Sequence, residues 1–297
     1  GATAAANNRV FDSAVVAEIQ DADENRVTTG NSSSQLLTIA AVSDGGSELT
    51  LSGADGLSVS GGSAILSNLQ LTGLVGTKTL TVSISTPALS GSRDIELGHG
   101  YATKLYISAP AAEATSRAEF GVQPTITVQD VSGNPVDDFV GRVSVAAEAG
   151  GANTLNQFTG SKFVELNDSP TANFDDLGIN GTVGSYTLTY RAVDDRTGQE
   201  LPTAAQSISL THGIAHEVVV SATSTVANAA PLGDVTATIK DEDGNPVTTG
   251  TPEVVLTVSG TNTVSLVGAA PANAINGVAT FTGLSILGLQ EQKTLTA

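Results

Sequence analysis

Hydrophobic and polar residues alternate in short runs along this chain, which is typical of β-strands that bury one face. The clearest runs are residues 15–20, 125–129 and 235–240, and each is followed by a turn rich in aspartate and asparagine. No apolar stripe at helical spacing extends over ten or more residues of the sequence. Threonine, valine and glycine are abundant, and they favour strands and the turns between them. We therefore predict an all-β fold.

The three runs also belong to the same longer unit, because each leads into an acidic turn at residues 21–30, 130–136 or 241–250. Two further blocks recur with matching internal spacing: apolar arms at residues 64–81, 172–189 and 279–296, and His-Gly-x-Ala at 99–102 and 212–215. We infer three tandem repeats with a period of about 110 residues, which suits an autonomous β-sandwich and is too long for a solenoid repeat.

We accordingly predict three immunoglobulin-like β-sandwiches: residues 1–98, 99–211 and 212–297, named units 1, 2 and 3 below. Their cores should contain apolar residues at matched positions: Leu66, Leu69, Leu71 and Leu80 in unit 1, Phe174, Leu177, Ile179 and Leu188 in unit 2, and Phe281, Leu284, Ile286 and Leu295 in unit 3.

The same alignment bears on the two ends of the chain. Pairing Asp21 with Asp241 places Gly1 beside Ser221, after the opening strand that units 2 and 3 have, and Ala297 stops before a closing strand. We expect units 1 and 3 to be incomplete sandwiches whose missing strands come from a longer repeat array. Strand exchange with neighbouring subunits is the alternative.

The Asp-x-x-Gly-Asn-Pro-Val turns at 130–136 and 241–247, the arms ending at 172–174 and 277–281, and the strand at 102–107 share a known pattern. With them the chain resembles the immunoglobulin-like repeats of large bacterial surface proteins of the invasin/intimin and giant-adhesin kind. Unit 1 departs from the pattern, since Glu24-Asn25-Arg26 replaces Gly-Asn-Pro, and we expect its turn to be shaped differently. The resemblance implies a secreted or cell-surface protein whose repeats act as spacers.

Composition narrows the function further. Twelve basic against 30 acidic residues give a net charge of −18, which disfavours nucleic acid and anionic membrane surfaces as partners. The absence of cysteine excludes disulfides and thiolate chemistry. No apolar run approaches the roughly 18 residues of a membrane span, so we expect no membrane insertion in this segment. The motifs of hydrolases and phosphate-binding enzymes are also missing, and we predict that the chain is not an enzyme.

The acidic turns supply the one candidate metal site. Oxygen-bearing side chains stand at alternate positions in two of them: Asp241, Asp243 and Asn245, and in parallel Asp21, Asp23 and Asn25. Calcium takes six to eight oxygen ligands, of which such a loop supplies three, and neither loop has the spacing of an EF-hand. The alternative is a hairpin turn in which Asp and Asn cap backbone amides. Calcium is the only cofactor hypothesis that we retain, beside no cofactor at all.

Together these features predict an extracellular structural or adhesive segment, the stalk or filament shaft of a bacterial cell-surface protein. Its expected partners are neighbouring repeats of the same or adjacent chains. A surface-array or virion decoration protein is one alternative. Another is a module that binds a glycan or protein receptor through unit 2, where the insertion at residues 191–202 accompanies Tyr186, Tyr190 and Phe158.

Overall fold

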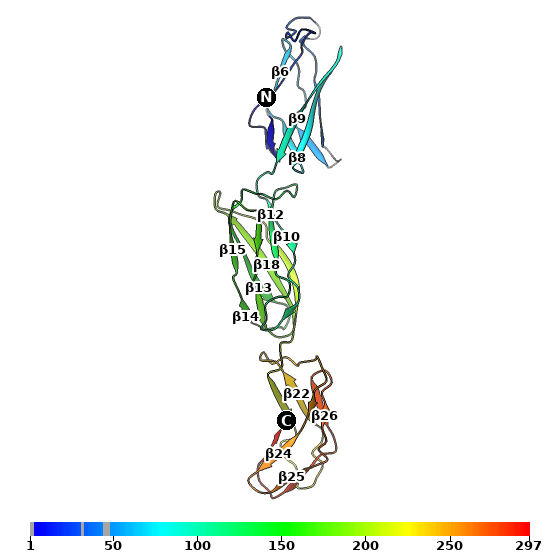
Figure 1. Cartoon of the computed structure of the whole chain (residues 1–297), viewed down its shortest axis with the longest axis vertical. Helices are drawn as coiled ribbons and strands as arrows, with labels where there is room; N and C mark the ends of the chain where they lie inside the picture. Colours follow the sequence, from blue (N-terminus) through cyan, green and yellow to red (C-terminus); the bar gives the residue numbers. More distant parts are fainter. Residues whose placement is uncertain (1–2, 31–32, 44–47) are drawn as a thin grey trace.

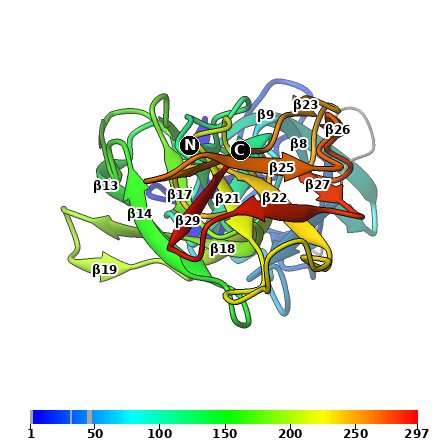
Figure 2. The same ribbon diagram turned by 90° about the horizontal axis from the view of Figure 1, so that it is seen from below.

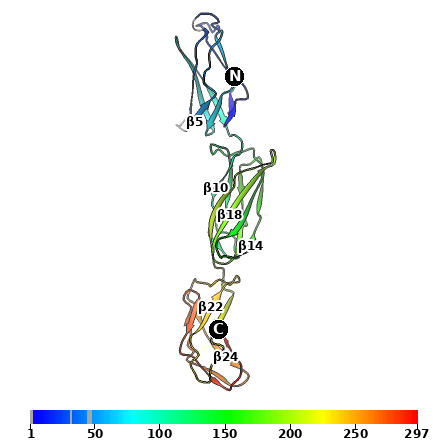
Figure 3. The ribbon, with the colours of Figure 1, turned by 180° about the vertical axis from the view of Figure 1, so that it is seen from behind.

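The computed structural model describes residues 3–30, 33–43 and 48–297, and its regular elements are β-strands. Three lobes follow one another along the long axis, and the view from behind shows the same line (Figures 1 and 3). In the described residues the buried hydrophobic side chains form three separate clusters, one inside each predicted unit. The unit boundaries themselves stay a prediction. No helix in this part of the chain is long and apolar enough to cross a membrane.

Unit 2 has two sheet layers packed around a core. One layer is the sheet β11-β20-β18-β13-β15, with β19 paired to β18, and the other contains β10-β12-β16 and β14-β17. Tyr186, Tyr190 and Phe139 are its largest fully buried side chains. The strands are β10 (Lys104–Ala109), β11 (Ala114–Thr115), β12 (Thr125–Gln129), β13 (Val140–Ala149), β14 (Leu155–Thr159), β15 (Phe163–Asn167), β16 (Thr171–Asn173), β17 (Gly178–Gly181), β18 (Gly184–Asp194), β19 (Gln199–Glu200) and β20 (Ala204–Thr211).

Unit 1 repeats this plan, but its described residues contain no counterpart of β10. Strand β1 runs parallel to β9, as β11 runs parallel to β20. Among the described residues, β3 pairs with β6 and no strand pairs with its other edge. The strands are β1 (Ala4–Ala6), β2 (Arg9–Val10), β3 (Val15–Glu18), β4 (Thr38–Ser43), β5 (Leu49–Ser52), β6 (Ser63–Leu66), β7 (Gln70–Gly73), β8 (Gly76–Ser85) and β9 (Ala88–Gly98).

Unit 3 has a counterpart of β10 in β21 but none of β20 in the described chain. Strand β29 pairs with β24 alone, whereas β18 of unit 2 lies between β13 and β20. Figure 2 looks along the long axis from below, so that unit 3, with β21, β22 and β29, lies nearest the viewer. The strands are β21 (Glu217–Ser221), β22 (Val235–Lys240), β23 (Glu253–Val254), β24 (Thr257–Gly260), β25 (Val264–Val267), β26 (Ala272–Asn273), β27 (Val278–Phe281), β28 (Ser285–Gly288) and β29 (Lys293–Thr296).

The predicted core agrees with the structure except at two positions. Ile286 and Leu295 are only partly buried, while the other predicted core residues are buried. Their counterparts in unit 2, Ile179 on β17 and Leu188 on β18, are fully buried, and β18 has neighbours on both sides. The exposed core of unit 3 therefore lies where a strand equivalent to β20 is absent from the described residues.

Candidate functional site, the joints between units

The acidic turns are tight and are held by an aspartate. In unit 3, the Asp241 N–H donates to the Asn245 carbonyl at 2.9 Å, and the Gly244 N–H donates to the Asp241 carbonyl at 3.1 Å. Oδ1 of Asp241 also accepts the N–H groups of Asp243 and Asn245, at 3.0 and 2.8 Å. The turns of units 1 and 2 repeat these four hydrogen bonds at the equivalent residues.

The expectation of a different turn in unit 1 is wrong. Glu24 adopts a φ of 66°, close to the 91° and 81° of Gly133 and Gly244 at the same position. A left-handed backbone is unfavourable for glutamate, but two amides bound to the Asp21 carboxylate hold the turn in this shape.

An asparagine of the unit 3 turn binds the backbone at the end of unit 2. Nδ2 of Asn245 donates to the Gly181 carbonyl at 2.9 Å, and its Oδ1 accepts the Val183 N–H at 2.8 Å. Nδ2 also donates to Oδ2 of Asp241 at 2.9 Å. The side chain thus satisfies one backbone carbonyl and one backbone N–H group of the preceding unit. Asn245 is only 5% exposed.

The joint between units 1 and 2 has the same geometry. Nδ2 of Asn134 donates to the Gly73 carbonyl at 3.0 Å and to Oδ2 of Asp130 at 2.8 Å. Its Oδ1 accepts the Val75 N–H at 2.9 Å. Two joints of different sequence are therefore built by the same set of hydrogen bonds, and Asp130 and Asn134 are both buried.

The linker glycines belong to these joints as well. The N–H groups of Gly100 and Gly213 donate to Oδ2 of Asp130 and Asp241, at 2.8 and 2.7 Å. A Cβ atom at either glycine would lie only 2.3 or 2.7 Å from a carbonyl oxygen of the preceding unit. The His-Gly-x-Ala blocks of the sequence are therefore linkers in which only glycine fits at the second position.

At each joint a polar residue of the preceding unit bridges the backbone of its own unit and the turn of the next unit. Oδ1 of Asn7 accepts the Gly73 N–H at 2.8 Å, while its Nδ2 donates to Oδ2 of Asp130 at 2.7 Å. Ser116 takes this position in unit 2: its hydroxyl accepts the equivalent backbone N–H at 3.2 Å and donates to Oδ2 of Asp243 at 2.6 Å. Asn7 and Ser116 are both buried.

The joint between units 2 and 3 has an additional ion pair. Arg117 contacts both carboxylate oxygens of Asp243, at 3.0 and 3.3 Å, and Glu242 at 2.9 Å. Asn156 donates to Oδ1 of Asp243 at 2.8 Å. The Asp243 side chain is only 1% exposed, and a two-pronged arginine contact fixes orientation as well as distance. This joint is therefore held by more polar contacts than the first.

The joint aspartates are strongly ionised. Burial by itself raises the pKa of Asp241, but hydrogen bonds from Asn245 and from the Gly213 amide outweigh it, so the pKa lies below its usual value. Asp130 behaves in the same way. Burial raises its pKa, but the hydrogen bonds from Asn134, the Gly100 amide and Asn7 lower the pKa by more, so it too lies below its usual value. The joints are thus built for the charged form of both carboxylates.

The residues predicted to bind calcium are therefore joint residues in unit 3. Both carboxylate oxygens of Asp241 accept N–H groups, and Oδ1 of Asn245 accepts the Val183 N–H, so a cation would compete with these donors. Throughout the described ranges, no three His, Asp or Glu side chains cluster so as to hold a metal ion. The parallel residues of unit 1, Asp21 to Asn25, are exposed. The calcium hypothesis stays a prediction.

The aromatic residues predicted as a receptor-binding surface in unit 2 belong to its core instead. Tyr186 and Tyr190 are fully buried and Phe158 is 9% exposed. The Tyr186 hydroxyl lies 2.7 Å from the Thr182 carbonyl, and burial raises the pKa of this tyrosine. The insertion forms the β18–β19 hairpin. A ligand on the surface of unit 2 would not reach these three rings.

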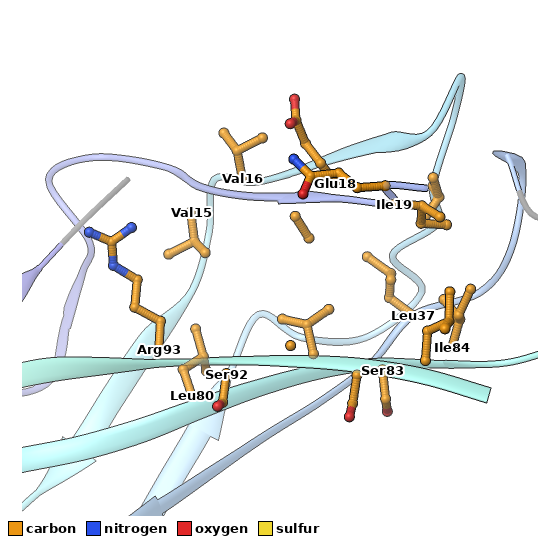
Figure 4. Close-up of a pocket in the computed structure, with 17 residues that line it drawn as sticks. Val15, Val16, Glu18, Ile19, Leu37, Leu80, Ser83, Ile84, Ser92 and Arg93 are labelled. Atoms are coloured by element: carbon orange, nitrogen blue, oxygen red, sulfur yellow. The ribbon is translucent and has the colours of Figure 1, made fainter. Parts of the chain in front are cut away.

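A groove of about 490 Å³ opens in unit 1 between β3 and the β8–β9 pair. Figure 4 shows Val15 and Leu37 directed into it, and Val16 pointing away. In unit 2 the corresponding edge, on β12, is paired with β10, whose Leu105 is buried in the core. The groove therefore marks the position that an opening strand occupies in the other units.

Comparison with known proteins gives structural likenesses only. No family model matches the chain, and no curated protein matches it. The Escherichia coli adhesin FdeC shares 18% identity over 97% of this chain and 88% of its own, with a TM-score of 0.40. InvD of Yersinia pseudotuberculosis shares 16% over 96% and 83%, with a TM-score of 0.37. Domains 4 and 5 of the surface-layer protein SbsC share 13% over 65% and 78%, with a TM-score of 0.25.

The likenesses to FdeC and InvD extend over nearly the whole chain. They agree with the resemblance to bacterial immunoglobulin-like repeats stated from the sequence. At these identities and TM-scores they carry no weight for function, which has to be argued from the joints.

Proposed function

We propose that this chain is a rigid segment of an extracellular stalk or filament shaft on a bacterial surface. The observation that carries the proposal is the recurrence of one joint. At both joints an Asp–Asn turn of one unit completes the backbone hydrogen bonds of the unit before it. A flexible string of domains would need no buried polar contacts between its members, whereas a spacer that must keep its direction does.

The chemistry of the joints suits that role. A buried polar group without a hydrogen-bond partner costs free energy. Bending at a joint would break the hydrogen bonds of the buried Asp and Asn side chains, and bending is therefore unfavourable. Each joint thereby favours one orientation between successive units. The net charge of −18 also suits a crowded shaft, because mutual repulsion keeps neighbouring shafts soluble.

The proposal is tested by the distribution of angles between units in negative-stain electron micrographs. The wild-type chain should give a narrow distribution at both joints. The double variant Asn134→Ala/Asn245→Ala should broaden both. Asn25→Ala alters a turn that contacts no other unit in the described residues, and it should leave both distributions unchanged. A broad distribution in the wild-type chain would refute the rod. Binding of the chain to a glycan array would instead favour the receptor-binding alternative.

A further inference from the structure

The third copy of the Asp–Asn turn lies at the outer end of unit 1. Strand β3 leads into it, and β6, which pairs with β3, lies toward the upper end in Figure 1. Its internal hydrogen bonds match those at the two joints, but Asp21 and Asn25 are exposed where their counterparts are buried. Unit 1 therefore presents a preformed joint turn without a partner among the described residues.

The opposite half of a joint lies at the outer end of unit 3. Gly288 and Gln290 occupy the positions of Gly73 and Val75, which form the accepting backbone pair of unit 1. Oδ1 of Asn228 accepts the Gly288 N–H at 3.0 Å, as Asn7 accepts that of Gly73 at 2.8 Å. Strand β25 pairs with β28 up to Gly288 and lies at the lower end in Figure 1.

The backbone establishes that Asn228 corresponds to Asn7. The residue after each of them has a positive φ, 56° at Asn8 and 63° at Ala229. The N–H groups of those residues donate to Leu71 and Ile286, which are equivalent positions. The sequence alignment that paired Gly1 with Ser221 is thus wrong by one residue for the positions before β3, because it would pair Asn7 with Ala227 instead of Asn228. Gly1 itself lies outside the described residues. Asn228 is exposed, whereas Asn7 is buried at its joint.

We propose that a second copy of this chain docks head to tail, with the Asp21–Asn25 turn of one copy against the outer end of unit 3 of the other. Asn25 would donate to the Gly288 carbonyl and accept the Gln290 N–H, and Nδ2 of Asn228 would donate to Asp21. Each of these contacts has a counterpart at the joint between units 1 and 2.

The two surfaces differ from each other and lie at opposite ends of the line, so the contact cannot close into a symmetric dimer (Figure 1). A head-to-tail contact between unlike surfaces continues into a filament. Leu289, 66% exposed beside the accepting backbone, would be covered only in part, since its counterpart Leu74 is 46% exposed at the joint between units 1 and 2. Net repulsion between copies opposes docking, and salt should therefore strengthen it. This docking proposal rests on the proposed function of the joints. If docking between copies is not observed, the proposed function of the two internal joints still stands, because the angle distributions test it separately.

Disulfide trapping tests the contact, because the chain has no cysteine of its own. Positions 23 and 228 are the ones to link. At the internal joints their counterparts lie 3.4 Å apart (Ser132 Oγ to Asn7 Oδ1) and 2.6 Å apart (Asp243 Oδ2 to Ser116 Oγ). Serine occurs at both positions in unit 2, so cysteine of similar size should be tolerated.

The variant Asp23→Cys/Asn228→Cys should form a ladder of disulfide-linked multimers under mild oxidation. The matched control is Asp23→Cys/Ser207→Cys, since Ser207 is exposed in the middle of unit 2. We expect the first variant to link at least ~10-fold faster, because docking raises the effective concentration of the two thiols. Adding Asn25→Ala should remove that advantage, and circular dichroism checks that every variant is folded. Equal rates in the two cysteine pairs, or no effect of Asn25→Ala, would overturn the proposal.

Discussion

Replacing Asn245 by alanine should weaken the coupling of unit 3 to unit 2. The substitution removes the two hydrogen bonds that Asn245 makes across the joint, to the Gly181 carbonyl and from the Val183 N–H, together with its bond to Asp241. The contacts of Asp243 with unit 2 remain. The backbone bonds that shape the turn remain, because they do not involve the Asn245 side chain. The change therefore acts on the joint and leaves the core of unit 3 intact.

The size of the effect follows from those three bonds. Each hydrogen bond contributes a net 0.5–1.5 kcal/mol or so, and Val183 is exposed enough for water to replace part of the loss, so we expect about 2 kcal/mol in all. For a unit of this size, a loss of that order lowers the melting temperature by about 8–16 °C.

Differential scanning calorimetry at low protein concentration measures this effect, because the transitions of separate units can be followed in one trace. The matched control is Asn25→Ala, the same change in a turn whose side chain touches no preceding unit in the described residues. It should shift the transition of unit 1 by much less. If the two variants shift their units equally, the asparagine stabilises only its own turn, and the joint argument fails.

Three further predictions concern the turns. Glu24→Gly should stabilise unit 1 by about 1 kcal/mol, because a left-handed backbone costs a non-glycine residue about 1–2 kcal/mol, and a lower melting temperature would contradict this. Since the pKa values of Asp130 and Asp241 are lowered in the fold, their contribution should be complete above the ordinary aspartate pKa of about 4 and be lost as pH falls through the lowered folded values, so micrographs taken over that acid range should show the joints bending as it is lost. If Asp241, Asp243 and Asn245 bind calcium, the transition of unit 3 should rise between chelator and millimolar Ca²⁺, and an unchanged transition would remove calcium from the account.

Sequence patterning was sufficient for the strands that carry the cores. The runs at 15–20, 125–129 and 235–240 became β3, β12 and β22, because alternation fixes which face of a strand is buried. It failed where pairing across the sheet decides the boundaries. Residues 253–260 form two separate strands, β23 and β24, and the two-residue strand β26 is too short for alternation to indicate.

The aromatic residues of unit 2 were misplaced although the sequence held the signal. Tyr186, Leu188 and Tyr190 alternate along β18, and all three are fully buried. Leu188 had been assigned to the core, so the strand period required its two neighbours at spacing two to point inward with it. The polar hydroxyl does not prevent this burial, because that of Tyr186 is bonded to backbone carbonyl oxygens.

The joints could not be derived from the turns alone. An Asp–Asn turn offers oxygens that suit a cation and an amide that suits a backbone pair, and the spacing is the same for both. The partners of Asn245 lie 62 and 64 positions away, across a gap that local patterning does not span. The repeats nevertheless contain a distinguishing feature. A metal site depends on its acidic ligands, and unit 2 has Ser132 where the other units have a second aspartate. Unit 2 nevertheless keeps the asparagine, Asn134. All three units also keep a glycine at the position of Gly73. Asparagine that recurs without the acid, together with a glycine that recurs one repeat earlier, is the pattern expected of a contact between successive units.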